Sequence, residues 1–220
     1  MTKLAIIHTS PATLEPLKAQ AADLLPGVEI VNFVDDSILP QLLQNGGNVA
    51  EVEDRLLHYA RFAEQVGADA ILSACSSLGE LTPSAQGTVS VPVVRIDDAM
   101  AEAAVQRGSR IGIAATLPTT LNPTTRLLQS KAEALGKSVE FKPVLVSGAY
   151  ERLMAGDKDG HDDMLVEALS ALAGEVDVVV LAQVSMARVL PRVPEDLRAK
   201  FLTSPRLGMQ AVKQALEANH

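Results

Sequence analysis

The first half of this 220-residue sequence is repeated in its second half. Residues 4–16 align with residues 111–123 so that three kinds of residue, threonine, proline and leucine, coincide at one constant offset. With one residue of slippage, residues 68–72 (ADAIL) also align with residues 176–180 (VDVVV). Two matches in the same order indicate a duplicated unit. We therefore expect two similar lobes with pseudo-twofold symmetry, facing each other across a cleft lined by their strand ends.

Apolar runs alternate with segments of helical periodicity along the whole chain, which is typical of α/β proteins. Because strands separated by helices pair in parallel, the predicted fold class is α/β, with a short, mainly parallel sheet in each of two pseudo-symmetric lobes. The first lobe is expected to span residues 1–96 with the C-terminal helix 205–220, and the second residues 97–204. Residues 35–48 are predicted to form a polar loop. The expected strands are 3–8, 28–34, 68–74, 91–96, 110–114, 138–144 and 176–182, and the expected helices are 14–25, 49–66, 98–106, 120–135, 149–154, 162–173 and 204–219.

Charge and cysteine content exclude several classes of function. The chain has 27 acidic and 19 basic residues, a net charge of −8, which disfavours nucleic acid and anionic membrane surfaces as partners. A single cysteine cannot form an intrachain disulfide and suits a reducing, cytoplasmic setting. Four scattered histidines and one cysteine show no metal-ligand spacing, so no metal site is expected.

The only cysteine, Cys75, follows the apolar run 70–74 and precedes two serines, Ser76 and Ser77. Ligands of parallel sheets gather at the carboxyl ends of strands, near helix N-termini. A thiol in that position can act as an acid, base or nucleophile. The alternative is a small buried hydrophobic side chain. Ser76 and Ser77, with their backbone N–H groups, are expected to bind a carboxylate or to cap the next helix.

Short polar side chains also follow the first strand of each half and the strand that matches the cysteine strand. They are expected to hold carboxylate oxygens, although hydroxyls at these places commonly cap helices. In the repeat, Cys75 falls opposite Gln183. The candidate substrate-binding residues in these segments are Thr9, Ser10, Thr116, Thr119, Gln183, Val184 and Ser185.

Taken in order, residues 9–10, 73–79, 115–120 and 181–188 resemble the aspartate/glutamate racemase superfamily, which includes hydantoin racemases, maleate isomerase and arylmalonate decarboxylase. The resemblance covers nearly the whole chain and implies a cofactor-independent enzyme acting on a small carboxylic acid. In that superfamily, two cysteines face opposite sides of the substrate carbon. Here only the first is present, and Gln183 occupies the place of the second.

Racemisation removes a proton from one face of a carbon and returns one to the other, so two acid/base groups normally flank that carbon. A glutamine amide cannot exchange a proton near neutral pH. His161, at the start of a predicted helix in the second half, is the best substitute base, with a surface histidine as the alternative. We expect a racemase or isomerase with Cys75 as the acid/base. A one-cysteine decarboxylase or lyase and a non-catalytic small-acid-binding protein remain alternatives, and a homo-oligomer is possible.

Overall fold

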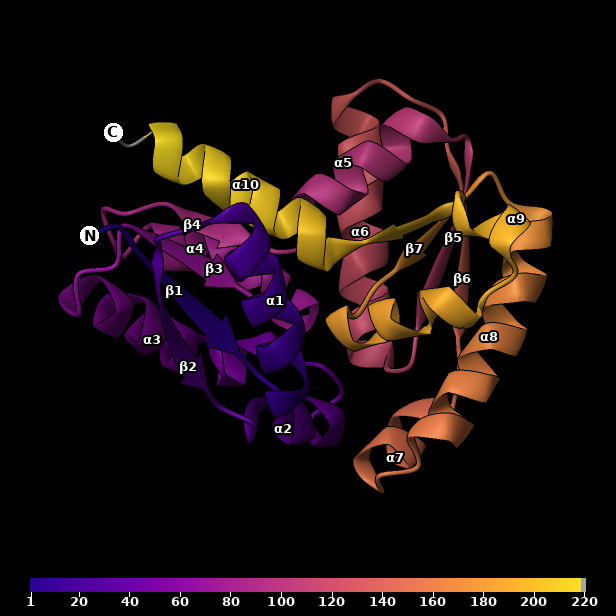
Figure 1. The fold of residues 1–220 in the computed structure, drawn as a ribbon, viewed down its shortest axis with the longest axis horizontal. Helices are drawn as coiled ribbons and strands as arrows, with labels where there is room; N and C mark the ends of the chain where they lie inside the picture. The colour runs from indigo at the N-terminus through magenta and orange to yellow at the C-terminus, as the bar shows by residue number, and fades with distance from the viewer. Residues whose placement is uncertain (219–220) are drawn as a thin grey trace. The chain divides into compact units, whose positions relative to one another are not determined.

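The protein is described by a computed structural model, in which residues 1–218 are placed (Figure 1). The chain divides into two compact units. Unit 1 contains residues 1–99 and the C-terminal segment from residue 205, and unit 2 contains residues 100–204. Each unit holds one four-stranded sheet in which every neighbouring pair of strands is parallel. Two parallel sheets with intervening helices confirm the predicted α/β fold.

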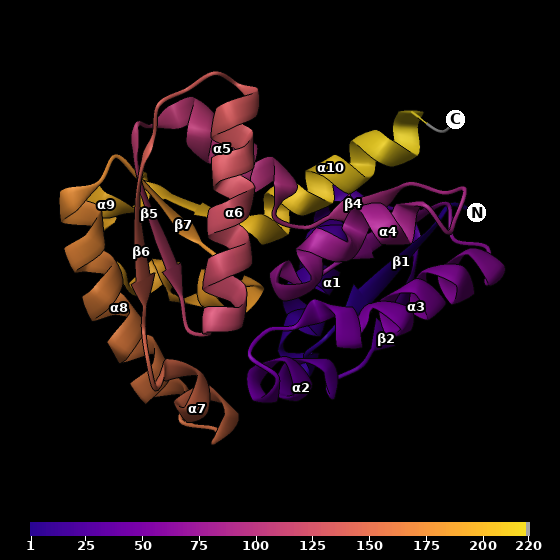
Figure 2. The ribbon, with the colours of Figure 1, turned by 180° about the vertical axis from the view of Figure 1, so that it is seen from behind.

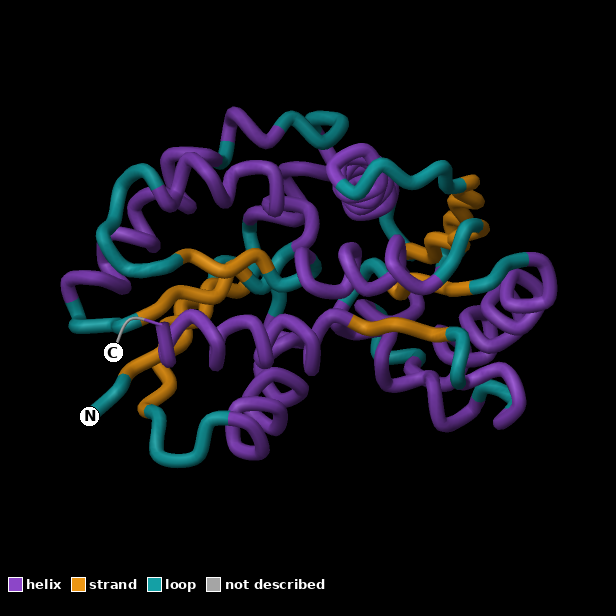
Figure 3. The backbone as a smooth tube through the Cα atoms, turned by 90° about the horizontal axis from the view of Figure 1, so that it is seen from above, coloured by secondary structure: helices purple, strands orange, loops and turns teal. Residues whose placement is uncertain are grey.

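Unit 1 has the strand order β2-β1-β3-β4, so the cysteine strand β3 is one of the two central strands. Helix α1 lies over one face of the sheet in Figure 1, and α3 and α4 lie over the opposite face in Figure 2. Figure 3 shows the strands of this unit with helices on both sides. Its elements are β1 (Lys3–His8), η1 (Pro11–Thr13), α1 (Leu14–Leu24), β2 (Glu29–Val34), α2 (Ile38–Gln44), η2 (Val49–Glu51), α3 (Glu53–Gln65), β3 (Ala70–Ser73), η3 (Ser76–Leu81), α4 (Thr82–Gln86), β4 (Val93–Arg95) and α10 (Ser204–Ala218), where η marks a 3₁₀ helix.

The central strands of unit 1 are buried on both faces. Successive side chains of a strand point to opposite faces, so Ala5 and Ile7 enter a different layer from Leu4 and Ile6. Ala5 and Ile7 belong to a core cluster that also contains Cys75 and buried side chains of α2, α3, η3 and α4. This burial on both faces explains why β1 and β3 are continuous apolar runs rather than alternating ones.

Unit 2 has the strand order β6-β5-β7-β8, the same arrangement as unit 1. Its strands lie between α6 and α8 (Figure 1). The largest core cluster joins β5 and β7 to α8, η4 and β8. Its elements are α5 (Asp98–Arg107), β5 (Arg110–Ala115), α6 (Pro118–Ala134), β6 (Glu140–Leu145), α7 (Ala149–Met154), α8 (Lys158–Glu175), β7 (Val178–Leu181), η4 (Val184–Arg192), α9 (Glu195–Arg198) and β8 (Phe201–Thr203).

The backbone of the two units repeats as the sequence does. In unit 1, the β1–β3 pair sets Leu4 opposite Ala70, and in unit 2 the equivalent β5–β7 pair sets Ile111 opposite Val178. The turn before the cysteine strand is also reproduced, because the N–H of Asp69 donates to the Lys3 carbonyl just as the N–H of Asp177 donates to that of Arg110. The one-residue slippage seen in the sequence is therefore present in the strand register.

The structure differs from the predicted elements at α2 and β8. Residues 35–48 were predicted to be a loop, but they contain the helix α2, whose Ile38, Leu39 and Leu42 are buried; the loop prediction was wrong over 38–44. The three-residue strand β8 was not predicted, because so short a segment carries no recognisable alternation. The last predicted helix is found as α10 up to Ala218, and its expected final position, 219, lies outside the described residues.

Candidate active site

Cys75 lies where β3 passes into η3. It is the N-cap residue of this 3₁₀ helix, with an extended backbone conformation (φ −134°, ψ 111°). The side chain is 8% exposed. A buried parallel strand thus delivers the thiol to the carboxyl edge of the sheet, at the position predicted from the apolar run.

Hydrogen-bond donors surround the Cys75 sulfur. Burial raises the pKa of the thiol above its ordinary value, while the Thr9 hydroxyl, the backbone N–H groups of Leu78 and Ser77, and the Ser77 hydroxyl act in the opposite direction because they stabilise the thiolate. Burial outweighs the donors, so the pKa stays raised, which favours the neutral thiol. A neutral thiol with thiolate-stabilising donors can give up a proton and take one back.

The predicted serines of unit 1 differ in how their side chains are used. Ser76 and Ser77 are both buried, and Ser77 bonds to the sulfur. Ser10 is the N-cap of η1, where its hydroxyl oxygen accepts a hydrogen bond of 3.3 Å from the N–H of Ala12. The contact with Ala12 shows that Ser10 caps η1. Substrate binding by Ser10 and Ser76 stays a prediction.

Gln183 in unit 2 occupies the position equivalent to Cys75, as the N-cap of η4. The amide oxygen of Gln183 accepts hydrogen bonds from the N–H of Thr116 at 2.6 Å and from the Thr116 hydroxyl at 2.9 Å. A backbone N–H can only donate, so the atom facing it must be the amide oxygen. The –NH₂ group of Gln183 is thereby left to donate to another acceptor.

The same contact is therefore built twice with different chemistry. The Thr9 hydroxyl bonds to the thiol in unit 1, and the matching Thr116 hydroxyl bonds to the amide oxygen in unit 2. Thr9 and Thr116 are almost completely buried. The sequence repeat predicted that Thr9 and Thr116 correspond, but it assigned both to substrate binding. Their hydroxyls contact the side chains of Cys75 and Gln183, and substrate binding by Thr9 and Thr116 stays a prediction.

The remaining candidates of unit 2 lie in the first turns of α6 and η4. Thr119 follows Pro118 at the start of α6, and its hydroxyl is buried without a hydrogen-bond partner among the described residues. Val184 and Ser185 open η4 directly after Gln183; Val184 is buried and Ser185 is half-buried. No hydrogen bond assigns a substrate role to these residues, so their roles remain predictions.

His161 lies near the start of α8, and its ring is fully buried. Nδ1 lies 2.7 Å from Oδ1 of Asp162, while Nε2 is buried and has no partner among residues 1–218. Asp162 in turn pairs with Arg188 at 3.1 Å and Arg192 at 3.6 Å, both from η4. The sequence did not single out Asp162, because an acid in the charged run after His161 looks like surface. Arg188, the last residue of the segment 181–188, pairs with Asp162.

A second histidine, His8, ends β1 beside Thr9. Its ring bonds to Thr13 at 2.7 Å and to Asn32 at 2.9 Å. Burial lowers the pKa of His8, and the hydrogen bond to Asn32 opposes that effect only in part. Both ring nitrogens have protein partners, so His8 supports the fold beneath Thr9.

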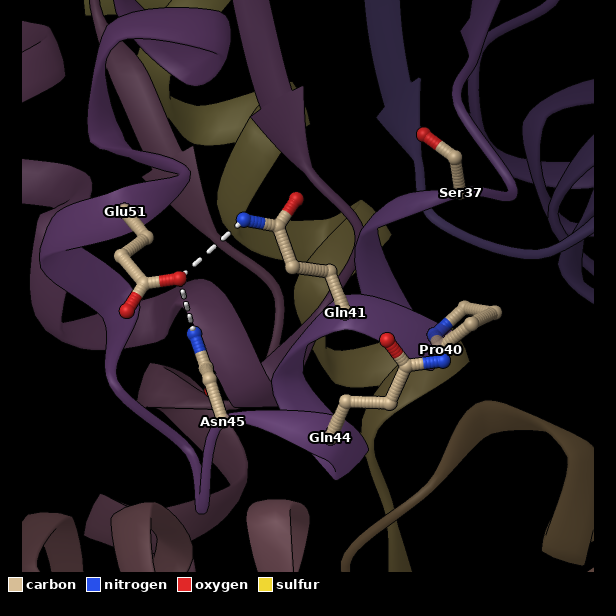
Figure 4. A pocket seen from close by; sticks show the side chains of 6 residues that line it. All are labelled: Ser37, Pro40, Gln41, Gln44, Asn45 and Glu51. Carbon is tan, nitrogen blue, oxygen red and sulfur yellow. Dashed lines mark hydrogen bonds between the residues drawn. The ribbon is translucent and has the colours of Figure 1, made fainter.

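An open hollow lies beside α2 in unit 1 (Figure 4). Its only carboxylate, Glu51, accepts hydrogen bonds from the side-chain amides of Asn45 at 3.0 Å, Gln41 at 3.3 Å and Asn48 at 3.2 Å. These bonds lower the pKa of Glu51 and occupy its oxygens. None of the predicted site residues lines it. Its lining residues are Ser37, Pro40, Gln41, Gln44, Asn45 and Glu51.

Residues 1–218 contain neither a metal-binding cluster nor a membrane-spanning helix. No group of three or more His, Cys, Asp or Glu side chains in this part of the chain is arranged to hold a metal ion. None of the helices described here combines the length and the apolar character needed to cross a membrane.

Solved structures of similar fold cover almost the whole chain. Glutamate racemase isoform RacE1 from Bacillus anthracis matches with a TM-score of 0.77 and 17% identity over 99% of this chain and 82% of that one. Allantoin racemase from Klebsiella pneumoniae matches with a TM-score of 0.67 and 19% identity over 99% and 89%. The Gly74Cys mutant of arylmalonate decarboxylase matches with a TM-score of 0.63 and 17% identity over 99% and 94%. At these identities the likeness is one of fold.

No curated protein sequence gives a significant match to this chain. The family model described as Asp/Glu/Hydantoin racemase, in contrast, matches residues 5–212. That range contains both strand-end clusters, around Cys75 and around Gln183. The chain therefore belongs to the Asp/Glu/hydantoin racemase family.

Proposed function

We propose that this protein is a cofactor-independent enzyme of the racemase or isomerase type that moves a proton at the carbon next to a carboxylate. The observation that carries the proposal is the environment of Cys75. The only thiol of the chain stands at the end of a central strand, with donors from Thr9, Ser77 and Leu78 around its sulfur. Filler in a hydrophobic core does not need such donors, whereas a thiol that alternates with its thiolate does.

Racemisation needs two acid/base groups, and we assign these roles to Cys75 and His161. For one enantiomer, unprotonated Nε2 of His161 takes the α-proton, and the electron pair of the broken C–H bond moves into the carboxylate to form an enediolate. The Cys75 thiol then protonates the other face of that carbon and becomes the thiolate. For the opposite enantiomer the Cys75 thiolate takes the proton and the His161 imidazolium returns one.

The enediolate needs hydrogen-bond donors, because it carries more negative charge on its oxygens than the carboxylate. The –NH₂ group of Gln183, whose amide oxygen accepts from Thr116, is such a donor. We assign to Gln183 the role of orienting and stabilising this intermediate, with Ser76, Thr119 and Ser185 as further candidates for contacts to the carboxylate.

The test is racemisation of single enantiomers, followed by chiral chromatography on a panel of amino acids, hydantoins and 2-substituted carboxylic acids. Wild-type protein should convert at least one enantiomer into its mirror image. Cys75→Ala should lose about 10²-fold or more of that rate, since one general acid/base contributes about that much. Gly174→Ala in α8, where an added Cβ would meet nothing within 4 Å, should keep the rate and would show that the loss is not a general effect of substitution. Wild-type rates in Cys75→Ala would refute the proposal.

A second candidate is a decarboxylase or lyase, and the state of Gln183 favours it. An amide held by Thr116 cannot exchange a proton, so a site with Cys75 as its only acid would protonate one face alone. Such an enzyme would release carbon dioxide from 2-substituted malonates and give one enantiomer of the product. Carbon dioxide release without any racemisation would select this candidate over the first.

A further inference from the structure

A cluster of charged side chains, with Asp162 and His161 buried within it, lies at the start of α8 in unit 2. Asp162 is 4% exposed and lies at its centre: Oδ1 faces Nδ1 of His161 at 2.7 Å, and Oδ2 faces Arg188 at 3.1 Å and Arg192 at 3.6 Å. Arg192 also pairs with the neighbouring Asp163. A carboxylate so deeply buried is stable only when it is paired.

We propose that Asp162 is the positioning residue of this site: it holds the ring of His161 in one orientation and one tautomer, with the proton on Nδ1 and the lone pair on Nε2. The proposal rests on the role given to His161 above and names the residue that prepares it.

The tautomer follows from the chemistry of the contact. An ionised carboxylate has no hydrogen to donate, so the hydrogen between Asp162 and the ring belongs to Nδ1 of His161. In the neutral ring, Nε2 is then an acceptor. This atom is buried and has no partner within residues 1–218, which is uncommon for a buried polar atom. A vacant acceptor held in place by a carboxylate is the arrangement that a general base requires.

The two arginines that pair with Asp162 connect it to another segment of unit 2. Arg188 and Arg192 belong to η4, the helix that begins directly after Gln183. Both guanidinium groups lie against the Asp162 carboxylate and are partly exposed, so their attraction to it is partly screened. Asp162 thus connects the ring of His161 to the segment that carries Gln183.

A separate ion pair lies near this helix start. Arg152 of α7 bonds to the carboxylate of Asp157, the N-cap residue of α8. Its guanidinium also packs against Gly160, where an added Cβ would come within 2.5 Å of it. Asp162 is the group that bonds to the ring of His161 directly.

The experiment is ¹⁵N NMR of the histidine rings, with the signals of His161 assigned by their absence in His161→Gln. Wild-type protein should show a protonated Nδ1 and an unprotonated Nε2. In Asp162→Asn, the amide oxygen should stay with Arg188 and the –NH₂ group should face the ring. Nδ1 must then accept, and the proton should move to Nε2.

Asp163→Asn is the matched control, because it removes the same charge one residue away and leaves the ring contact intact. It should keep the wild-type tautomer and a turnover within about twofold of wild type, whereas Asp162→Asn should lower turnover by about 10³-fold or more, as a wrong tautomer does in a histidine–aspartate pair.

A wild-type His161 protonated on Nε2, or an unchanged tautomer in Asp162→Asn, would overturn the proposal. If Asp162→Asn fails to fold, the wild-type spectrum alone still tests the proposal, because it shows which ring nitrogen of His161 carries the proton. Because the NMR measurement needs no substrate, a protein that racemises nothing but shows the expected tautomers would refute the proposed function and leave the positioning of His161 by Asp162 intact.

Discussion

At the scale of single residues, the properties of Cys75 result from two opposed effects. Burial favours the neutral thiol, and the donors of Thr9, Ser77 and Leu78 favour the thiolate. A sequence that ends an apolar run in Cys-Ser-Ser predicts the place of this thiol. It cannot predict the Thr9 contact, because that hydroxyl arrives from another strand.

Replacing Thr9 by valine should slow alkylation of Cys75 by iodoacetamide. A hydrogen bond to a charged group contributes about 1.5–3 kcal/mol, and 1.36 kcal/mol corresponds to one pKa unit. Loss of the hydroxyl should raise the pKa of Cys75 further, shift the pH profile of alkylation upward and reduce its rate near pH 8 by about tenfold or more. Only the thiolate reacts, so the rate should rise with pH in both proteins.

Ser10→Ala is the control for this comparison, since the Ser10 hydroxyl bonds to the N–H of Ala12 rather than to the sulfur. Its alkylation profile should overlay that of the wild type. Equal rates in Thr9→Val and wild type would show that the Thr9 hydroxyl does not stabilise the thiolate.

At the scale of helices and strands, the two sheets follow from patterns that a sequence carries well: long apolar strands and a repeat with one slippage. The elements that were missed have weak local signals. Helix α2 contains a proline, tolerated at Pro40 because it lies in the first turn, and has polar neighbours. The ring contact of His161 was also missed, because only the folding of α8 against η4 buries Asp162 and brings Arg188 to it.

One glycine shows how tightly a central strand of unit 2 is packed. A Cβ added to Gly112 in β5 would lie 2.8–2.9 Å from side-chain atoms of Leu172, which is itself buried. Gly112→Ala should therefore lower the free energy of unfolding by about 1–3 kcal/mol, the usual cost of overpacking a core. Urea denaturation followed by circular dichroism measures this difference.

Gly174 provides the matched control because it lies in α8, where an added Cβ would meet nothing within 4 Å. Gly174→Ala should leave the free energy of unfolding unchanged or raise it by up to about 1 kcal/mol, since alanine is the better helix former. If both variants were equally stable, the packing of β5 against α8 described here would be wrong.

At the scale of the whole molecule, duplication has preserved the backbone and changed the chemistry. Both units set a threonine after the first strand against the residue that ends the third, but that residue is a thiol in unit 1 and an amide in unit 2. The sequence repeat and its resemblance to the racemases were sufficient to predict the fold and the family. The substrate could not be predicted, because its identity depends on side chains whose hydroxyls serve equally well as caps.

The central claim is that Cys75 delivers a proton to the carbon next to a carboxylate, and deuterium transfer in D₂O tests it most directly. The same panel of acids would be incubated with wild type and with Cys75→Ser, and deuterium at the α-carbon measured by NMR. Wild type should introduce deuterium by racemisation or by decarboxylation. The rate of deuterium transfer by Cys75→Ser should be lower by about 10²-fold or more. Undiminished deuterium transfer by Cys75→Ser, or none by the wild type, would contradict the claim.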